Sequence, residues 1–359
     1  MQIAVTYLKQ ILIMTVSAIF IMVFAIPAGT EEFKQEYKMT VNVGPSFYWG
    51  MGAIKFSELV KEKTGGKINI KPYFGSSLLK GAQLNSPQMV SNGVIDCAFE
   101  STINISPVIP EMNIFSLPFF INTYERLDRL ESGETGKILF GKMEKVGLTP
   151  LAWAENGFRQ VTNSKKPVLM PEDMKGLRLR VVGSPIFIDT FKALGADPVD
   201  MNWGDAQTAF QQGIVDGQEN PMGVLLPVQI WQYHKFVTFW NYVADPIIIY
   251  WGSGSWNKFP DEIKSAITEA AKEAARFEKA MCRAGLDQDV SLDILKNEFN
   301  YEMKVPAPVK HLEDNKMTVT RINPETVEAF TRATATVYDK WIPRVGKELY
   351  EAAKKDMGN

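Results

Sequence analysis

The chain has 359 residues, 45% hydrophobic and 22% charged, and its 39 Lys+Arg against 41 Asp+Glu give a net charge of −2. This length predicts two domains of common size, and the composition argues against disorder and coiled coils. A near-neutral charge without a long basic run excludes a dedicated nucleic-acid binder. The two Cys and two His are too few for a Cys/His zinc site, so we expect no metal and no cofactor.

The N-terminus has the pattern of an export signal. Ile11 to Ile26 form an uncharged apolar run, preceded by Lys9 and followed by small residues up to Ala28. This order predicts a signal peptide over residues 1–28 and a periplasmic protein. An uncleaved membrane anchor is the alternative, because the two patterns look alike.

The location affects how the two cysteines, Cys97 and Cys282, are interpreted, because the periplasm is an oxidising compartment. Cys97 lies in an apolar stretch and Cys282 in a helical one. We expect two buried thiols, although a disulfide stays possible.

From Lys38 onward short β-like runs alternate with helical runs, which is typical of an α/β fold. Gly65 and Gly66 are expected to end the first helix in a left-handed conformation, and Ser86 to cap a later one. The expected elements of this half are strands at 39–44, 67–74 and 94–99 and helices at 49–66 and 86–93.

The alternation repeats further along, with a strand at 177–182 and a helix opened by Ser184 and Pro185. Asn202 is expected to cap the next helix, with Asp205 as its capping-box partner. Two long helices are expected at 261–303 and 324–355. The pattern predicts two α/β lobes with added C-terminal helices.

Motifs of enzyme active sites are missing from the sequence. The string at 133–137 lacks the spacing of a phosphate loop, and GxSxG, HExxH and CxxC do not occur. His234 and His311 have no local partner that would activate a nucleophile. We therefore expect a protein that is not an enzyme.

Arg180 is the strongest candidate for ligand binding. Alternation along the strand places Arg178 and Arg180 opposite the leucines, and Arg180 lies near the carboxyl end, just before the helix start at Ser184. Ligands of α/β sheets gather at such ends, where helix N-termini favour anions, and arginine suits a carboxylate. A surface arginine in a salt bridge is the alternative. Arg159 is a second candidate, or else a structural arginine bonded to carbonyls.

Aromatic residues supply the other signal. Phe47, Tyr48 and Trp49 lie between the first strand and the first helix, and Trp203 opens a later helix. Aromatic side chains at these positions can form the wall of a ligand pocket. Core packing is the alternative for each of them.

Taken together, several motifs resemble one known family. The sequence is similar to the solute-binding proteins of tripartite ATP-independent periplasmic (TRAP) transporters, in particular the DctP-type branch. The motifs that carry this resemblance are NGFRQVTNSKKPV (156–168), PEDMKGLRLRV (171–181), ALGADPVDMNW (193–203) and VDGQENP (215–221).

The resemblance implies a two-lobed periplasmic-binding-protein-like fold, with crossing strands, a long helix and closure by hinge motion. The first lobe would hold residues 29–156 plus 246–285. The second would hold 157–245 plus 286–359, including the C-terminal helices. The resemblance leaves open whether the protein is a monomer or a weak homodimer.

The resemblance also assigns roles in the cleft. Arg180 would clamp a carboxylate, with Arg159 as a second ligand-facing arginine, while Asn220, Glu100 and Trp203 match positions that face ligand in relatives. The implied function is to bind a small organic acid and deliver it to TRAP membrane subunits. The aromatic residues favour an acid with a ring or apolar face, such as an aromatic or sugar acid. The alternatives are a periplasmic lyase or hydrolase working through Glu100, and a sensor component that presents its ligand.

Overall fold

The computed structural model describes residues 33–358, so the expected signal peptide at 1–28 lies outside the described residues. A compact body begins at Glu36 and contains two β-sheets. Within the described residues, none of the helices combines the length and the apolar character needed to cross a membrane.

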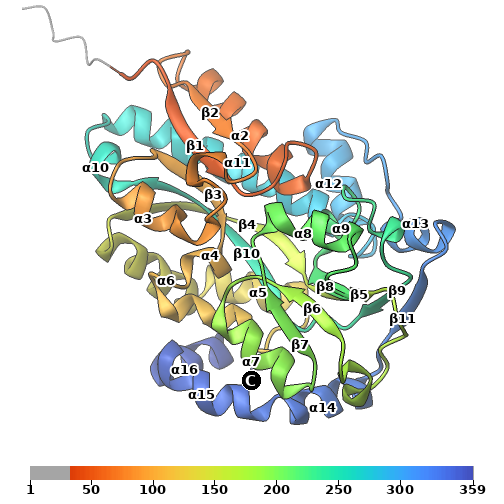
Figure 1. The fold of residues 1–359 in the computed structure, drawn as a ribbon. Coiled ribbons are helices and arrows are strands. Elements are labelled where there is room, and N and C mark those ends of the chain that lie inside the picture. Colours follow the sequence, from red (N-terminus) through yellow and green to blue (C-terminus); the bar gives the residue numbers. More distant parts are fainter. Residues whose placement is uncertain (1–32, 359) are drawn as a thin grey trace, which may run out of the picture. The chain divides into compact units, whose positions relative to one another are not determined.

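The first sheet has five strands in the order β2-β1-β3-β10-β4 (Figure 1). β1 pairs in parallel with β2 and β3, whereas β10 runs antiparallel to β3 and β4. Every residue of β3 and β10 is buried, as expected for strands covered on both faces. The strands are β1 (Tyr37–Val41), β2 (Ile70–Tyr73), β3 (Cys97–Ser101), β4 (Leu148–Phe158) and β10 (Ala244–Gly252).

The second sheet has six strands in the order β11-β9-β5-β8-β6-β7. β6 pairs in parallel with β7 and β8, and β5 runs antiparallel to β8 and β9. The strands are β5 (Gln160–Asn163), β6 (Arg178–Val181), β7 (Asp197–Asp200), β8 (Gly217–Asn220), β9 (Phe236–Phe239) and β11 (Thr318–Arg321).

Two nearly continuous strands join the sheets. β4 ends the first sheet at Phe158 and, after Arg159 alone, the chain enters β5 of the second sheet, while β9 returns into β10. Gly157 in this crossing has φ 106°, a backbone conformation that residues other than glycine rarely adopt. A Cβ at this position would also lie 3.3 Å from the Pro221 side chain. The expected two-lobed α/β fold with crossing strands is confirmed.

Helices cover the first sheet, and we call this half of the molecule the first lobe. The glycines at 65 and 66 have φ 59° and 80°, so the predicted left-handed end of the first helix is confirmed. Ser86, however, is the first helical residue rather than the cap. The helices are α2 (Tyr48–Lys63), α3 (Ser86–Ser91), α4 (Thr102–Ile105), α5 (Tyr124–Ser132), α6 (Glu134–Lys145), α10 (Ser253–Trp256), α11 (Asp261–Arg283) and α12 (Val290–Phe299), with 3-10 turns at Ser77–Leu79, Gln83–Asn85 and Pro110–Ser116.

Around the second sheet, which forms the second lobe, the helices are shorter. Asn202 occupies the cap position of α8, but its side chain makes no capping hydrogen bond, so the predicted capping box is wrong. These helices are α7 (Pro185–Ala193), α8 (Trp203–Gln211), α9 (Met222–Leu225) and α13 (Pro308–Asp314), with 3-10 turns at Pro171–Met174 and Ile230–Gln232.

Neither of the two long C-terminal helices predicted from the sequence is continuous. The first breaks after Arg283, because Gly285 has φ 70° and lies so close to Pro306 that a Cβ would approach the Pro306 carbonyl oxygen to 2.1 Å. The second is divided at Thr334 and at Gly346, which has φ 95°. It forms α14 (Pro324–Ala333), α15 (Ala335–Val345) and α16 (Lys347–Asp356).

The last helices touch both lobes. α16 packs against α5 and α6, and its Asp356 accepts hydrogen bonds from the first backbone N–H groups of α6, whereas α15 packs against both α7 and the 3-10 turn Pro110–Ser116 of the first lobe. α12 packs on α11. How the chain divides between the lobes therefore stays a prediction, with α12 and α16 as the segments to check.

Candidate functional site

A cavity of about 40 Å³ lies where the two lobes and the crossing strands meet. Strand and helix ends from both sheets supply its walls, as expected for ligand sites of α/β proteins. It is lined by Asn42, Val43, Trp49, Gln83, Ser101, Ile103, Asn104, Asn156, Arg159, Arg180, Val182, Trp203, Asn220, Val224 and Asp245.

Arg180 reaches this cavity from β6 and is only 2% exposed. Its Nε and Nη2 donate hydrogen bonds to the carbonyl oxygen of Met201, at 3.0 and 2.6 Å, and its guanidinium lies 5.5 Å from the ring centre of Trp203. Among residues 33–358 it forms no ion pair. Burial lowers its pKa to about 10. The cavity therefore holds a buried positive charge with no bound counter-charge.

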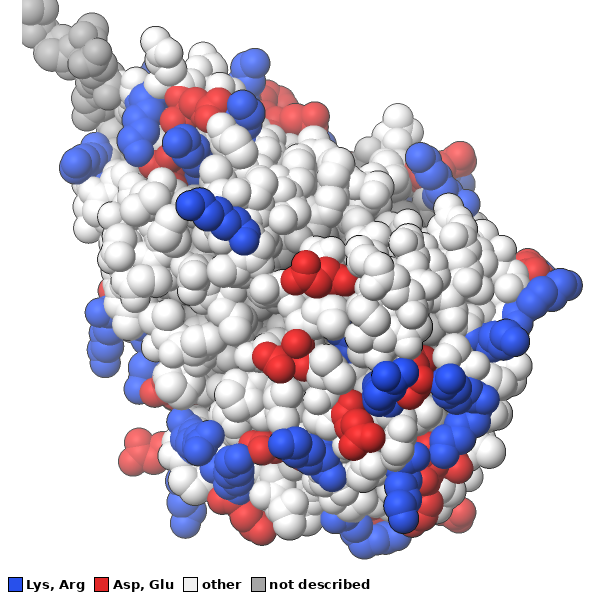
Figure 2. Space-filling model, viewed as in Figure 1, with Lys and Arg blue, Asp and Glu red and all other residues white. Residues whose placement is uncertain are grey.

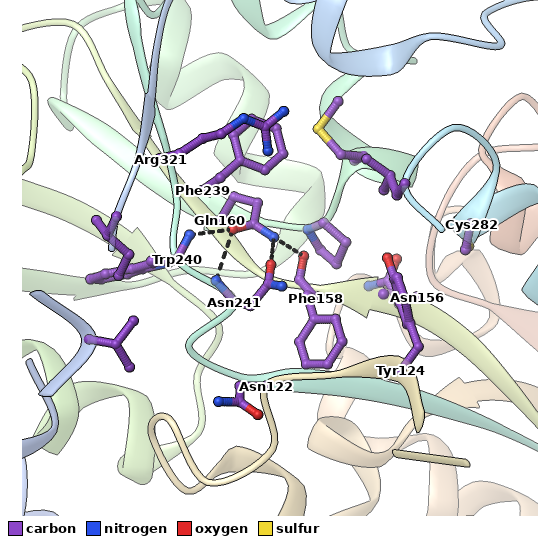
Figure 3. Close-up of a pocket in the computed structure, with 16 residues that line it drawn as sticks. Asn122, Tyr124, Asn156, Phe158, Gln160, Phe239, Trp240, Asn241, Cys282 and Arg321 are labelled. Atoms are coloured by element: carbon purple, nitrogen blue, oxygen red, sulfur yellow. Dashed lines mark hydrogen bonds between the residues drawn. The ribbon is translucent and has the colours of Figure 1, made fainter. Parts of the chain in front are cut away.

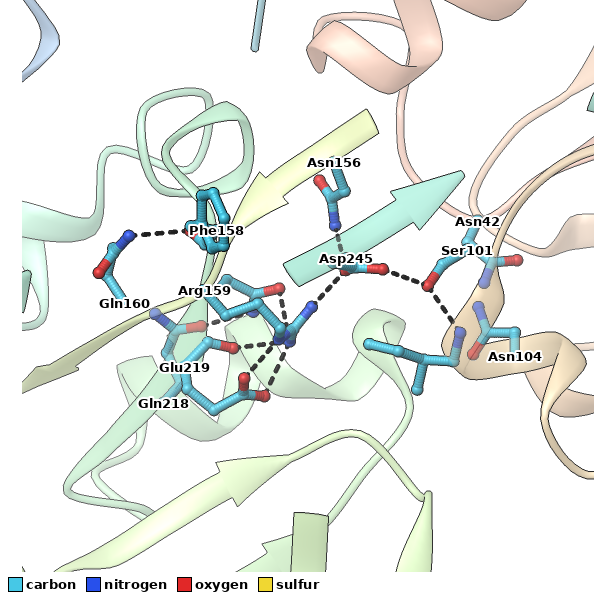
Figure 4. A network of polar contacts seen from close by, with 12 residues as sticks. Asn42, Ser101, Asn104, Asn156, Phe158, Arg159, Gln160, Gln218, Glu219 and Asp245 are labelled. Atoms are coloured by element: carbon cyan, nitrogen blue, oxygen red, sulfur yellow. Dashed lines mark hydrogen bonds and ion pairs between the residues drawn. The ribbon is translucent and has the colours of Figure 1, made fainter. Parts of the chain in front are cut away.

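Arg159 is also buried, but two carboxylates neutralise it (Figure 4). It forms a two-pronged ion pair with Glu219, and its Nη1 donates to Asp245 at 2.6 Å. The side-chain oxygen of Asn220 accepts a further bond at 3.0 Å. Although burial lowers the pKa of Arg159, the charges of its partners raise it above the usual value. Arg159 is thus firmly placed but already paired.

Asp245 extends this pairing across the lobes. Its Oδ1 accepts from the Ser101 hydroxyl at 2.5 Å and its Oδ2 from the Asn156 side chain at 2.8 Å, as well as from Arg159 (Figure 4). These four residues come from β10, β3, β4 and the crossing itself. The buried network therefore ties the two crossing segments to β3 of the first lobe.

Glu100 lies behind the first-lobe wall of the cavity. Its Oε1 accepts hydrogen bonds from Asn42 at 3.0 Å, Asn104 at 2.7 Å and the Ser101 backbone at 3.1 Å. Burial raises its pKa to about 8, against the lowering effect of the Asn104 bond. Glu100 does not line the cavity; it orients the two asparagines that do.

The four predicted aromatic residues fall into two groups, those that line the cavity and those that do not. Trp49 and Trp203 line the cavity, and the Trp49 indole donates to the Phe99 carbonyl at 2.6 Å. Phe47 meets Trp203 edge to face, with ring centres 6.1 Å apart. Tyr48 packs instead in the hydrophobic cluster of α11 and α12.

Of the predicted site residues, the structure therefore brings Arg180, Arg159, Asn220, Trp203 and Trp49 to one cavity. Phe47, Tyr48, Glu100 and Ser184 lie outside its wall. Ser184 is buried at the start of α7, and its hydroxyl has no hydrogen bond within residues 33–358. Ligand contact by any of them stays a prediction.

Sequence reasoning missed other lining residues. Asn42, Ser101 and Asn104 follow strand ends of the first sheet, so the rule that selected Arg180 would have found them. Gln83 lies in a short 3-10 turn and has no signal in its sequence context.

A second cavity, of about 350 Å³, is lined by both crossing segments, at 156–160 and 239–241 (Figure 3). Asn156 lines both cavities. Gln160 braces the wall with bonds to the Phe158 carbonyl, the Asn241 side chain and two backbone N–H groups of the 239–241 loop. Among residues 33–358, Arg321 is the one charged residue that lines this cavity.

Away from these cavities, acidic and basic side chains are interspersed on the face seen in Figure 2. The described surface in this view shows no field of one sign. On this face, no broad positive field adds to the local charge of Arg180.

Comparison with protein families decides the relationship of the chain. The model of the bacterial extracellular solute-binding proteins, family 7 (DctP), matches residues 39–344. The chain belongs to this family. Resemblance to TRAP-transporter solute-binding proteins, expected from the sequence motifs, is thereby confirmed.

Solved structures of other solute-binding proteins support this family assignment. A TRAP periplasmic solute-binding protein of Ralstonia eutropha H16, with (S)-2-acetolactate bound, is 44% identical, with a TM-score of 0.84 over 91% of this chain and 99% of that one. The sugar-acid-binding protein DctPAm of Advenella mimigardefordensis, in complex with galactonate, is 26% identical, with a TM-score of 0.79 over 90% and 100%.

A curated relative gives a third comparison. The C4-dicarboxylate-binding periplasmic protein DctP of Rhodobacter capsulatus is 28% identical over 316 residues, which cover 87% of this chain and 88% of that protein. Solute-binding proteins of this type thus share the fold of the chain and bind organic acids that differ in size and in number of carboxylates.

Proposed function

We propose that this solute-binding protein captures a small organic acid between its lobes and that the acid's carboxylate binds Arg180. The observation that carries the proposal is the buried guanidinium of Arg180, which has no anionic partner among residues 33–358. A charge left in this state is costly, and a bound carboxylate would compensate it. The acids bound by the Ralstonia and Advenella neighbours belong to the same chemical class.

The charges in the cavity favour an acid with one carboxylate. Glu219 and Asp245 already neutralise Arg159, so only the charge of Arg180 is free. A second carboxylate would lie near those two acids without a cation of its own. Monocarboxylates should therefore bind more tightly than C4-dicarboxylates.

The shape and polarity of the cavity describe the rest of the ligand. A cavity of about 40 Å³ has room for only about one or two water molecules, so the lobes must move apart to admit an acid, and a compact acid needs the smallest movement. Asn42, Asn104 and Asn220 can bond hydroxyl or oxo groups. Val182 and Trp203 offer an apolar wall. A short hydroxy- or oxo-acid with an apolar side fits these walls best.

We further propose that the protein is exported by its N-terminal signal, acts in the periplasm as a monomer or weak homodimer, and releases the acid unchanged to TRAP membrane subunits. The family and the periplasmic relatives support this role. Glu100, the residue that an enzyme reading would use, lies behind Asn42 and Asn104 rather than in the cavity wall.

The test is calorimetric titration of the purified protein with (S)-2-acetolactate, lactate, galactonate, succinate and malate. We expect tight binding of at least one monocarboxylate, weaker binding of succinate and malate, and loss of binding in Arg180→Ala. Arg178→Ala is the matched control, because Arg178 lies on the same strand but is exposed. Binding unaffected by Arg180→Ala would overturn the clamp.

Incubation with the bound acid separates a receptor from an enzyme. The ligand should be recovered intact, as judged by NMR of the released fraction after a day. A new product that forms with wild-type protein and not with Glu100→Gln would favour the lyase or hydrolase alternative.

A further inference from the structure

Gln83 joins the two lobes through its side-chain amide. It belongs to the 3-10 turn Gln83–Asn85 of the first lobe and is 5% exposed. Its Nε2 donates to Asn104 Oδ1 at 2.9 Å, and its Oε1 accepts from the backbone N–H of Trp203 in the second lobe at 3.0 Å. The Trp203 N–H can only donate, so this orientation of the amide is the one that satisfies both bonds.

The second-lobe end of this connection is the start of α8. The first N–H groups of a helix have no partner within the helix, and the side chain of Asn202 supplies none. Gln83 supplies the missing acceptor from the opposite lobe. The bond also holds the segment that ends at Met201, whose carbonyl accepts two bonds from Arg180.

The first-lobe end leads to the amide wall of the cavity. Asn104, which accepts from Gln83, donates to Glu100, and Asn42 donates to the same Glu100 oxygen. A single side chain therefore connects the asparagines of one wall with the segment that positions the arginine of the other.

We propose that Gln83 is a latch: its bonds to Asn104 and the Trp203 N–H form when the lobes close and slow the release of ligand. The proposal rests on the proposed function, because the latch acts on the same cleft. Its two partners belong to different lobes, so the bond to Trp203 exists only in the closed arrangement. Opening the cleft breaks that bond and frees the segment that supports Arg180.

The test compares Gln83→Ala and Gln83→Met with wild-type protein. Gln83→Met keeps the side-chain length and loses both hydrogen bonds, so it separates bonding from packing. Gln88→Ala is the matched control, because Gln88 lies five positions along the same lobe, is exposed, and bonds only to Asn92. Stopped-flow measurement gives the rates with the tightest-binding acid of the calorimetric series.

We expect both Gln83 variants to release the acid about 5- to 30-fold faster, with an association rate within about threefold of wild type. The ligand-free melting temperature should fall only slightly, because the bond between Gln83 and Trp203 contributes only in the closed part of the ligand-free population. Gln88→Ala should behave as wild type. A Gln83→Met variant with wild-type release would overturn the latch and leave packing as the role of Gln83.

A second measurement does not need an identified acid. Amide hydrogen exchange in the ligand-free protein should be faster at Trp203 in both Gln83 variants than in wild type and Gln88→Ala, in proportion to the closed population. Unchanged exchange at Trp203 would overturn the latch even if no acid bound. Failure of every acid to bind wild-type protein would instead refute the proposed function, so the two failures are distinct.

Discussion

Two buried arginines lie on the same cavity, and their surroundings differ sharply. Arg159, at the crossing of the lobes, is enclosed by Glu219 and Asp245. Within the part of the chain that the structure describes, the guanidinium of Arg180 contacts only the carbonyl of Met201 and the ring of Trp203. A carbonyl satisfies hydrogen bonds without cancelling charge. The first arginine is therefore part of the scaffold, and the second is available to a ligand.

The topology explains the difference. β8 and β10 approach the crossing from opposite lobes, so Glu219 and Asp245 reach Arg159 from both sides. Arg180 lies in β6, where its register partners are Val199 in β7 and Gln218 in β8, neither of which carries charge. A ligand anion would supply the negative charge that the strands on either side of Arg180 do not provide.

The largest effect should follow from removing the scaffold arginine. Arg159→Met leaves Glu219 and Asp245 buried without a cation, so the free energy of unfolding should fall by about 3–5 kcal/mol. Urea unfolding followed by circular dichroism measures the change. Arg178→Met, at an exposed position, serves as the control and should stay within about 0.5 kcal/mol of wild type. A loss below about 1 kcal/mol in Arg159→Met would contradict the scaffold role.

Removing the unpaired arginine should affect binding instead. Arg180→Met removes the one unpaired cation that the described residues place at the cavity, and the affinity for the acid should fall by about 30- to 4000-fold, equal to about 2–5 kcal/mol. The ligand-free protein should be as stable as wild type or more stable, because an uncompensated buried charge disappears. Calorimetric titration and urea unfolding of the same sample test both parts. Equal losses of stability in Arg159→Met and Arg180→Met would contradict the assignment of a structural role to Arg159 and a binding role to Arg180.

Glu100 resembles Arg180 in being buried with hydrogen-bond partners but without a partner of opposite charge. Three N–H groups donate to its carboxyl oxygen, and no described cation pairs with it. Its pKa, raised from 4.5 to about 8 by burial, exceeds that of the unfolded chain. Its contribution to stability is therefore complete below about pH 4.5 and is lost as the pH rises through about 8. Glu100→Gln imitates the protonated form and should remove this part of the pH dependence.

The expected gain of Glu100→Gln over wild type is near zero at pH 4.5 and grows to about 3–5 kcal/mol at pH 8. Urea unfolding across this range, with the exposed Glu58→Gln as control, provides the measurement. A constant difference between the two proteins at every pH would mean that Glu100 does not titrate in the window.

Much of the fold could be predicted because local patterns determine it. Short apolar runs revealed four of the strands, β1, β2, β3 and β6, and the paired glycines after Lys63 revealed a helix end. The C-terminal breaks were missed because they depend on distant contacts. Gly285 fits only because Pro306 lies against it, a contact that no window of sequence contains.

In the candidate site, too, only features set by local sequence could be predicted. Arg180 could be found, since strand alternation and the following helix start are local features. The neutralisation of Arg159 could not, because Glu219 and Asp245 lie 60 and 86 positions away. Gln83 was missed for the same reason, since Trp203 is 120 positions further along the chain.

The smallest effect concerns salt, and it follows from where the free charge lies. Arg180 is buried and the whole chain carries a net charge of only −2, so neither a long-range field nor exposed ions should govern binding. Raising sodium chloride from about 0.05 to about 0.5 M should therefore change the dissociation constant of the acid by less than about threefold. Titration at four salt concentrations tests this. A tenfold weakening would mean that bulk ions reach Arg180 and compete with the acid, and that its separation from solvent is weaker than its contacts imply.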